Sequence, residues 1–280
     1  MHDAPRFGFE IISFERNELD ATNEDQVREK INATRCDILI NAAAYHVVAD
    51  CEKNLEEAMR VNFAAVVRMA RLCKERMIPF VTYSTFSVFD GETNAPYAEE
   101  DMPRPLQMYS ISKLAGEYGA RVAYPEGAFI IRTGALYGGA STGSPDKGGN
   151  FVLGILKDLE TKKKIEVSAE QIMNPTFAGD LSSATLDLLG KHAPAGIYHL
   201  ANEGYCSYAD FAQEIVLHAG SDAIIMPVDR GGKSGSFQRS RFAALKNIKG
   251  AARGVIMPPW KEGLKSYMAS LNESSKNERH

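Results

Sequence analysis

Apolar positions along the first half of the chain alternate between short continuous runs and helical spacing. The runs predict strands at 10–14, 36–44, 80–84 and 128–133. Apolar residues at three- and four-residue steps between the runs predict helices at about 25–33, 56–75 and 110–123. Continuous apolar runs are typical of strands that are buried on both faces. The alternation therefore predicts a doubly wound α/β fold with a parallel sheet and right-handed crossovers.

A glycine- and serine-rich stretch at 138–150 interrupts this pattern. It is too long for an ordinary connection, so we expect a domain transition there. Beyond it, the pattern predicts helices at about 151–163, 179–189 and 207–219, and strands at 165–167 and 196–201. The polar end of the chain, 272–280, is expected to be a frayed tail.

Composition and charge exclude several classes of function. The 280 residues are 44% hydrophobic and 24% charged, which is typical of a water-soluble globular protein. Acidic residues outnumber basic ones by 36 to 32, so we expect no nucleic-acid partner. Without a long apolar segment or a leader pattern, we expect a cytoplasmic protein without a membrane span. The spacing of the four cysteines and six histidines predicts reduced thiols and no metal site.

Tyr109 and Lys113 form a pair that carries candidate chemistry. They lie four residues apart at the start of the predicted helix 110–123, so both side chains share one face. The preceding strand ends at Thr85, whose hydroxyl would lie at the carboxyl edge of the sheet, where such sheets bind ligands. An adjacent ammonium is expected to lower the pKa of the phenol toward the working range. Together the three groups could protonate a carbonyl oxygen.

Five ordered blocks extend this motif over nearly the whole chain. They are NAAAYHVVADCE (41–52), YSTFSVFDG (83–91), PYAEEDMPRPLQMYSISKLAGE (96–117), IIRTGALYG (130–138) and NPT (174–176). In this order and at this spacing, they resemble the extended short-chain dehydrogenase/reductases and, among these, the dTDP-4-dehydrorhamnose reductases. The resemblance implies a Rossmann-like nucleotide-binding domain and a smaller α/β substrate-binding domain. We assign 1–137 and about 176–200 to the first, and about 138–175 and 201–271 to the second.

The resemblance also implies a reaction, in which NADPH or NADH reduces a nucleotide-linked 4-keto-6-deoxy sugar. Tyr109 is implied to donate the proton, Lys113 to lower its pKa and hold the nicotinamide ribose, and Thr85 to orient the substrate. The implied cofactor contacts also include Asn41, Ala42, Ala43, Asn62 and Thr133. The implied substrate contacts are His46, Phe86 and Asn150. A homodimer is a further expectation, and magnesium stays open as an additional cofactor.

The amino-terminal segment departs from the family, which begins with a strand and a glycine-rich turn that binds the pyrophosphate. Gly8 is the one glycine before Gly91, and no such motif occurs in the chain. Because 10–23 resembles the family's second strand and the turn after that strand, about twenty residues of the pattern are expected to be missing. The alternatives are a start placed too far downstream, a natural fragment that has lost cofactor binding, and an altered fold in which 6–14 fills the gap. The surviving catalytic motif favours the first.

The end of the predicted strand 10–14 bears on cofactor preference. An acidic residue such as Glu15 would bond an adenosine ribose hydroxyl, whereas Arg16 would accommodate the 2′-phosphate of NADPH. Arg16 favours NADPH. Asp20 matches a family position near the adenine, and a turn or helix-capping role is its alternative.

Smaller departures affect the expected substrate site. The family usually has an acidic and an aromatic residue where this chain has Phe86 and Ser87, and a threonine where it has His46. The identity of the substrate therefore stays open, and a structural role is the alternative for His46. Two alternatives to a reductase also remain. One is a non-catalytic regulatory or binding subunit of the same fold, and the other is an inactive, truncated homologue.

Overall fold

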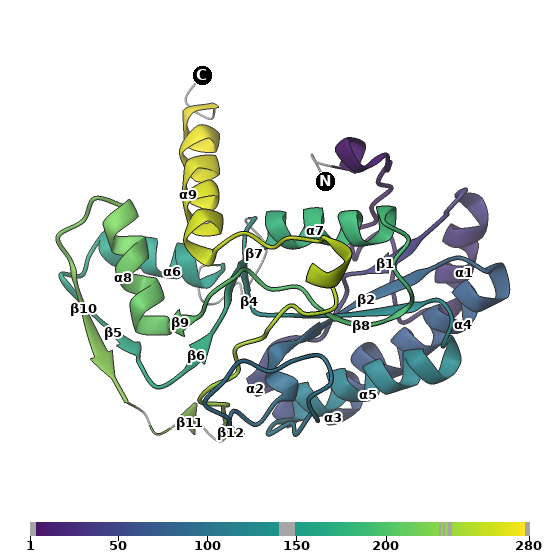
Figure 1. Ribbon diagram of the computed structural model, residues 1–280, viewed down its shortest axis with the longest axis horizontal. Coiled ribbons are helices and arrows are strands. Elements are labelled where there is room, and N and C mark those ends of the chain that lie inside the picture. The colour runs from purple at the N-terminus through teal and green to yellow at the C-terminus, as the bar shows by residue number, and fades with distance from the viewer. Residues whose placement is uncertain (1–3, 140–148, 230, 232, 235–236, 278–280) are drawn as a thin grey trace.

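A parallel sheet forms the centre of the computed structural model, which describes residues 4–139, 149–229, 231, 233–234 and 237–277. Its strands are β1 (Leu39–Asn41), β2 (Phe80–Thr85), β3 (Ala128–Thr133) and β8 (Gly196–His199), in the order β1-β2-β3-β8. Val81 pairs with Phe129, and Ile131 pairs with Tyr198. This sheet confirms the predicted α/β class (Figure 1).

Helices cover both faces of this sheet (Figure 1). The helices of the two layers are α1 (Glu24–Ala33), α4 (Val66–Arg76) and α5 (Met108–Ala123) on one side, and α7 (Ala178–Gly190) on the other. Alternate strand residues face opposite layers: Phe80 and Ile130 pack with α4, whereas Val81 and Ile131 pack with α7. Burial on both faces explains why these strands read as continuous apolar runs.

The region between β1 and β2 is more broken than its periodicity predicts. The helix expected at 56–75 forms as α3 (Leu55–Met59), a π-helical segment η2 (Arg60–Ala65) and α4. A short helix, α2 (Val48–Lys53), precedes it. The strand expected at 36–44 shortens to β1, because the Asn41 side chain accepts the Ala43 N–H at 3.0 Å and turns the chain.

The strand predicted at 10–14 does not form. The segment follows a short helix, η1 (Ala4–Phe7), without regular structure, and Ile12 is 56% exposed. Within the described ranges, no strand pairs with the outer edge of β1, so 10–14 has no neighbour to complete a hydrogen-bonded ladder. The alternative in which 6–14 fills a gap in the sheet is therefore wrong as well. Phe9 instead packs against the cluster beneath α7.

The second half builds a smaller α/β unit beside the sheet (Figure 1). Its elements are β4 (Ala135–Tyr137), α6 (Phe151–Leu159), β5 (Lys164–Ser168), β6 (Ile172–Met173), β7 (Pro175–Phe177), β9 (Cys206–Ser207), α8 (Tyr208–His218), β10 (Ile224–Val228), β11 (Lys233–Ser234) and β12 (Phe237–Gln238). An aromatic cluster fills its core: the Phe211 ring centroid lies 5.2 Å from that of Tyr137 and 5.7 Å from that of Trp260. The boundaries given above for two domains stay a prediction.

The end of the described chain is helical. After the short helices η3 (Phe86–Val88) and η5 (Ala251–Arg253), the helix α9 spans Trp260–Asn277. The helix therefore extends into the segment from 272 that was expected to fray, whose fraying stays a prediction, and 278–280 lie outside the described residues. In the part of the chain that the structure describes, no helix is long and apolar enough to cross a membrane.

Candidate active site

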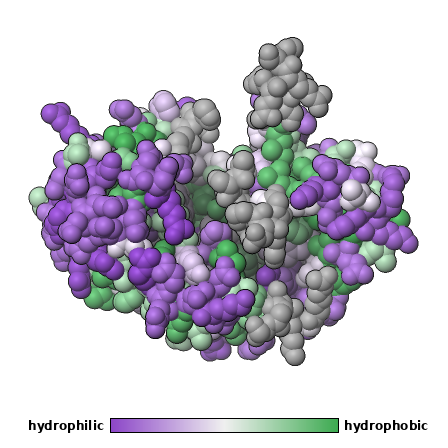
Figure 2. Space-filling view, turned by 180° about the vertical axis from the view of Figure 1, so that it is seen from behind, coloured by the Kyte–Doolittle hydropathy of each residue, from purple (hydrophilic) through white to green (hydrophobic). Residues whose placement is uncertain are grey.

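A pocket of about 670 Å³ opens where β1, β2 and β3 end, which is the edge that the sequence predicted. Residues of the smaller unit, among them Phe151 and Tyr208, form its other wall. From behind, the surface is hollowed between the two sides of the molecule, and apolar residues show in the hollow (Figure 2). The predicted site residues that line the pocket are Asn41, Ala42, Ala43, His46, Thr85, Phe86, Tyr109, Lys113, Thr133 and Asn150.

Tyr109 lies in the first turn of α5, close to the end of β2. Its phenol lies close enough to the Thr85 side chain for the two groups to interact. Its carbonyl oxygen accepts the Ser112 hydroxyl at 2.8 Å, and the amide of Asn62 donates to that hydroxyl at 2.9 Å. These bonds fix the first turn of the helix, and with it the phenol, against the neighbouring segment η2.

The pKa of Tyr109 differs from our expectation. Burial raises it to about 12, against a smaller lowering by the hydrogen bond with Thr85. Loss of solvent around the phenol is the largest cause, and the charge of Lys113 does not offset it. The expected lowering by an adjacent ammonium is therefore wrong for this structure. The phenol is protonated at neutral pH, which is the form that a proton donor needs.

Lys113 is a buried cation one helical turn after Tyr109. It is 6% exposed and lines the pocket, and its ammonium makes no hydrogen bond within the described ranges. Burial lowers its pKa to about 8, whereas the charge of Glu117 raises it. An ammonium without a protein partner at the wall of a pocket is placed to bind oxygen atoms of a ligand.

A buried ion pair lies behind Lys113. The Arg132 Nη2 donates to the Glu117 Oε2 at 2.6 Å, and its Nε lies 3.1 Å from both carboxylate oxygens. The Ser84 hydroxyl donates to the same carboxylate at 2.5 Å. Both side chains of the pair are 2% exposed. The pair joins α5 to β2 and β3, so it holds the helix that carries Tyr109 and Lys113.

Replacing Lys113 by Met is expected to stabilise the fold near pH 7. The folded pKa of about 8 lies below the ordinary 10.5. Below about pH 8 the buried amine is charged in the folded protein, so its burial lowers the free energy of unfolding by the full amount. At 1.4 kcal/mol per pKa unit, that cost is about 3 kcal/mol of unfolding free energy. Between the two values the unfolded chain binds more protons, so native stability rises with pH, and the Met variant lacks this rise. Urea unfolding of both proteins at pH 7 and pH 10 measures the difference.

Lys74→Met is the matched control for this prediction, because Lys74 is exposed on α4. It is expected to leave the unfolding free energy nearly unchanged. A Lys113→Met variant that is less stable than the native chain at pH 7 would show that burying the ammonium does not destabilise the fold.

The wall formed by β1 and β3 fits the nicotinamide–ribose half of a dinucleotide. Ala42 and Ala43 are exposed to the pocket, so flat groups can approach the backbone there. Thr133 is 6% exposed, and its hydroxyl has no hydrogen-bond partner in the described part of the chain. That hydroxyl and the ammonium of Lys113 would supply the polar contacts of such a ligand. The roles of these residues stay a prediction.

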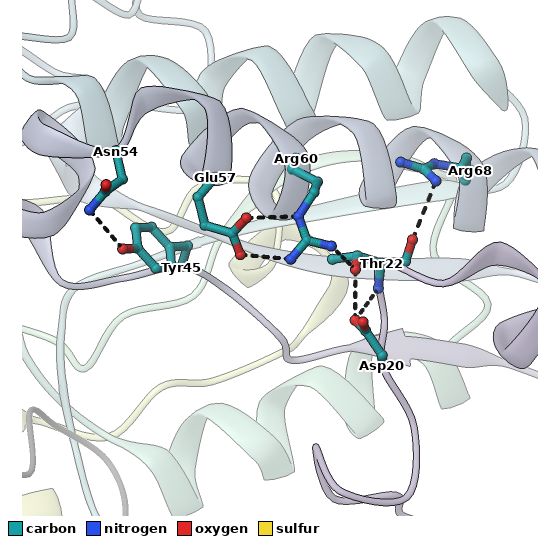
Figure 3. A network of polar contacts seen from close by, with 7 residues as sticks. All are labelled: Asp20, Thr22, Tyr45, Asn54, Glu57, Arg60 and Arg68. Carbon is teal, nitrogen blue, oxygen red and sulfur yellow. Dashed lines mark hydrogen bonds and ion pairs between the residues drawn. The ribbon is translucent and has the colours of Figure 1, made fainter.

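Arg16, Asp20 and Asn62 do not line the pocket. The carboxylate of Asp20 accepts the backbone N–H of Thr22 at 2.8 Å and its hydroxyl at 2.7 Å, which is the turn role given above as its alternative. Figure 3 shows Arg60 donating to the hydroxyl of Thr22 and to Glu57. The hydrogen bonds from Thr22 lower the pKa of Asp20, with smaller effects from the charges of Arg60 and Arg16. Asp20 therefore lies near the start of η2, to which Arg60 belongs.

Asn62 acts within the protein in this structure. Its side chain is 1% exposed, accepts the Tyr45 N–H at 2.9 Å and donates to the Tyr45 carbonyl at 2.8 Å. It also donates to Ser112, so it ties the segment after β1 to α5. The π-helical segment that carries it offsets the helix locally, a feature common at functional sites. Its cofactor contact stays a prediction.

The predicted substrate residues lie on different parts of the pocket wall. His46 is exposed, and Phe86 packs against two of the core clusters. Asn150 accepts the Leu153 N–H at 3.1 Å as the N-cap of α6 and donates to the Tyr267 hydroxyl at 2.9 Å. Asn150 thus has a structural role besides the one predicted.

Arg239 and Gln107 also line the pocket, and neither was a predicted site residue, although Gln107 lies within the block 96–117. Arg239 lies 5.5 Å from the Phe237 ring and pairs with no carboxylate among the described residues. Apart from Lys113, it is the one lysine or arginine among the described lining residues, and no Asp or Glu is among them. The pocket is therefore suited to an anionic ligand. In the same part of the chain, no cluster of three or more His, Cys, Asp or Glu residues could hold a metal ion.

Comparison with known proteins places the chain in a family. The profile of the RmlD substrate binding domain matches residues 1–273. The chain is 36% identical to a probable low-salt glycan biosynthesis reductase of Haloferax volcanii, over 92% of this chain and 86% of the relative. It is 31% identical to the spore coat polysaccharide biosynthesis protein SpsK of Bacillus subtilis, over 93% of this chain and 89% of the relative.

A solved structure agrees with these relatives. It is dTDP-4-dehydrorhamnose reductase from Bacillus anthracis in complex with NADP, which superposes with a TM-score of 0.86 at 30% identity. The match covers 94% of this chain and 90% of the other. The fold that the resemblance implied is therefore confirmed. The family profile matches nearly the whole chain, and both relatives are more than 30% identical to it over most of their own length. The chain therefore belongs to the RmlD substrate binding domain family.

Proposed function

We propose that this chain is an NAD(P)H-dependent reductase of a nucleotide-linked 4-keto-6-deoxy sugar, of the dTDP-4-dehydrorhamnose reductase type. The proposal rests on one observation: Thr85, Tyr109 and Lys113 line the same pocket at the carboxyl edge of the sheet. The NADP complex of the Bacillus anthracis relative and Arg16 favour NADPH as the cofactor.

The residues of the pocket supply the proton and hold the reacting groups. A bound nicotinamide cofactor supplies a hydride to the carbonyl carbon. The phenol of Tyr109 gives its proton to the carbonyl oxygen, so that the ketone becomes an alcohol. Solvent then returns a proton to the phenolate, and the ammonium of Lys113 holds oxygen atoms of the cofactor ribose. The hydroxyl of Thr85, in the same pocket as the phenol, orients the carbonyl oxygen.

The direct test is turnover. Purified protein is mixed with NADPH and a dTDP-linked 4-keto-6-deoxy sugar, and the absorbance of the reduced cofactor is followed at about 340 nm, the band of the reduced nicotinamide. We expect oxidation of the cofactor in step with formation of the sugar alcohol. Absence of any reduction with a folded protein that binds both ligands would contradict the proposal.

Replacing Arg239 by Met is expected to raise KM for the nucleotide sugar by about 10- to 100-fold with little change in kcat. The reason is that Arg239 offers a cation, free of carboxylate partners in the described chain, to the diphosphate of the substrate. Arg241→Met is the matched control, because Arg241 is exposed and does not line the pocket. Equal KM values for the two variants would show that Arg239 does not bind the substrate.

A homodimer and a cytoplasmic location complete the proposal. Ile111, Tyr118 and Val122 on α5 are 40%, 53% and 82% exposed, respectively, and their spacing places them on one side of the helix. An exposed apolar stripe on a helix supports self-association through that helix.

A further inference from the structure

Gln107 is a buried amide whose oxygen has no partner in the described part of the chain. It directly precedes α5, two residues before Tyr109, and it lines the pocket. The residue is 6% exposed, and its Oε1 accepts no hydrogen bond. Buried amide oxygens are nearly always hydrogen-bonded in proteins, so an unpaired one at the wall of a pocket points to a ligand.

The start of α5 explains why this amide is left over. The residue before a helix commonly uses its side chain to accept one of the first backbone N–H groups. At α5, the Glu52 side chain from α2 accepts the Met108 N–H at 2.8 Å instead. Gln107 makes no such capping bond. Its amide is therefore not needed to begin the helix.

The hydroxyl groups near Tyr109 form hydrogen bonds with one another and none with Gln107 in the described part of the chain. Ser87 lies between two of them: its Oγ is 3.0 Å from the Thr85 Oγ1 and accepts the Ser110 hydroxyl at 2.9 Å. Thr85 also lies close enough to the phenol of Tyr109 to interact with it. Since no Asp or Glu is among the described lining residues, Gln107 is a neutral acceptor in the same pocket as the proton donor.

We propose that Gln107 binds a hydroxyl group on the sugar carbon next to the carbonyl. Its Oε1 accepts the hydroxyl proton, and its amide N–H₂ can donate in return. This inference rests on the proposed function and names the substrate more narrowly. A site built to bind a hydroxyl strongly rejects an analogue that lacks it. The chain therefore reduces 4-keto sugars that keep the 3-hydroxyl and discriminates against 3-deoxy analogues.

The test compares native protein with Gln107→Met, which keeps the length of the side chain and removes the amide. We expect Gln107→Met to lower kcat/KM for the 3-hydroxy substrate by about 10- to 100-fold and to change that for the 3-deoxy substrate by less than about 3-fold. The Kd for NADPH is expected to stay unchanged. Gln213→Met, at an exposed position of α8, is the matched control.

Two other outcomes would contradict the inference. Equal losses on both substrates would make Gln107 a support for Tyr109, and a changed Kd for NADPH alone would make it a cofactor contact. If native protein turns over neither sugar, the proposed function fails. The Kd values of the 3-hydroxy and 3-deoxy nucleotide sugars, measured by calorimetry, then still test the role of Gln107. Tighter binding of the 3-hydroxy sugar that is lost in Gln107→Met supports the inference. Equal Kd values for the two sugars overturn it.

Discussion

Tyr109→Phe is expected to lower kcat for keto-sugar reduction by about 10²- to 10⁴-fold, the usual contribution of a positioned general acid. With a pKa of about 12, the phenol carries its proton at neutral pH, and it lies in the pocket with Thr85. Phenylalanine keeps the ring and loses the proton. The cofactor assay at about 340 nm gives kcat, and quenching or enhancement of nicotinamide fluorescence gives the Kd for NADPH.

The Kd for NADPH in Tyr109→Phe is expected to stay within about 3-fold of the native value, because the ammonium of Lys113 remains. Tyr205→Phe is the control, since Tyr205 is an exposed tyrosine that does not line the pocket. If Tyr109→Phe reduced the sugar at the native rate, Tyr109 would not be the proton donor.

Glu117→Gln is expected to lower the free energy of unfolding by about 3–5 kcal/mol, the usual cost of breaking a buried ion pair from one side. The substitution leaves the guanidinium of Arg132 with no opposing charge at a position where both side chains are 2% exposed. Urea unfolding at pH 7 measures the loss. Adding Arg132→Met is expected to recover part of it, because the unpaired charge is then removed as well.

The exposed pair of Glu57 and Arg60 provides the contrast. These side chains are 33% and 46% exposed, respectively, so Glu57→Gln is expected to cost less than about 1 kcal/mol. A cost for Glu117→Gln no larger than that for Glu57→Gln would mean that the buried pair does not hold α5 to the sheet.

The sequence predicted the elements in which local pattern and tertiary burial agree. β2 and β3 are buried on both faces, so their apolar runs indicated them directly. The segment 10–14 has the same type of run, but a strand also needs a neighbouring strand, and a run of apolar residues does not report whether one is there. The Tyr109–Lys113 pair was found because its spacing is local, within one helical turn.

The parts of the site that escaped prediction depend on distant contacts. The pKa of Tyr109 is set by burial, which only the packed structure reveals. Gln107 is left unpaired because Glu52, which is distant in sequence, caps α5 in its place. Arg239 reaches the pocket from a stretch of the smaller unit that carries no recognisable motif. None of these three features has a signal in sequence spacing.

The central claim is that this pocket holds a nicotinamide cofactor although the chain has no glycine-rich turn. Titration of NADPH and NADH into the purified native protein, followed by nicotinamide fluorescence with a thermal melt alongside, tests it most directly. We predict micromolar binding, tighter for NADPH than for NADH, together with a raised Tm. A protein that melts cooperatively and binds neither cofactor would contradict the claim.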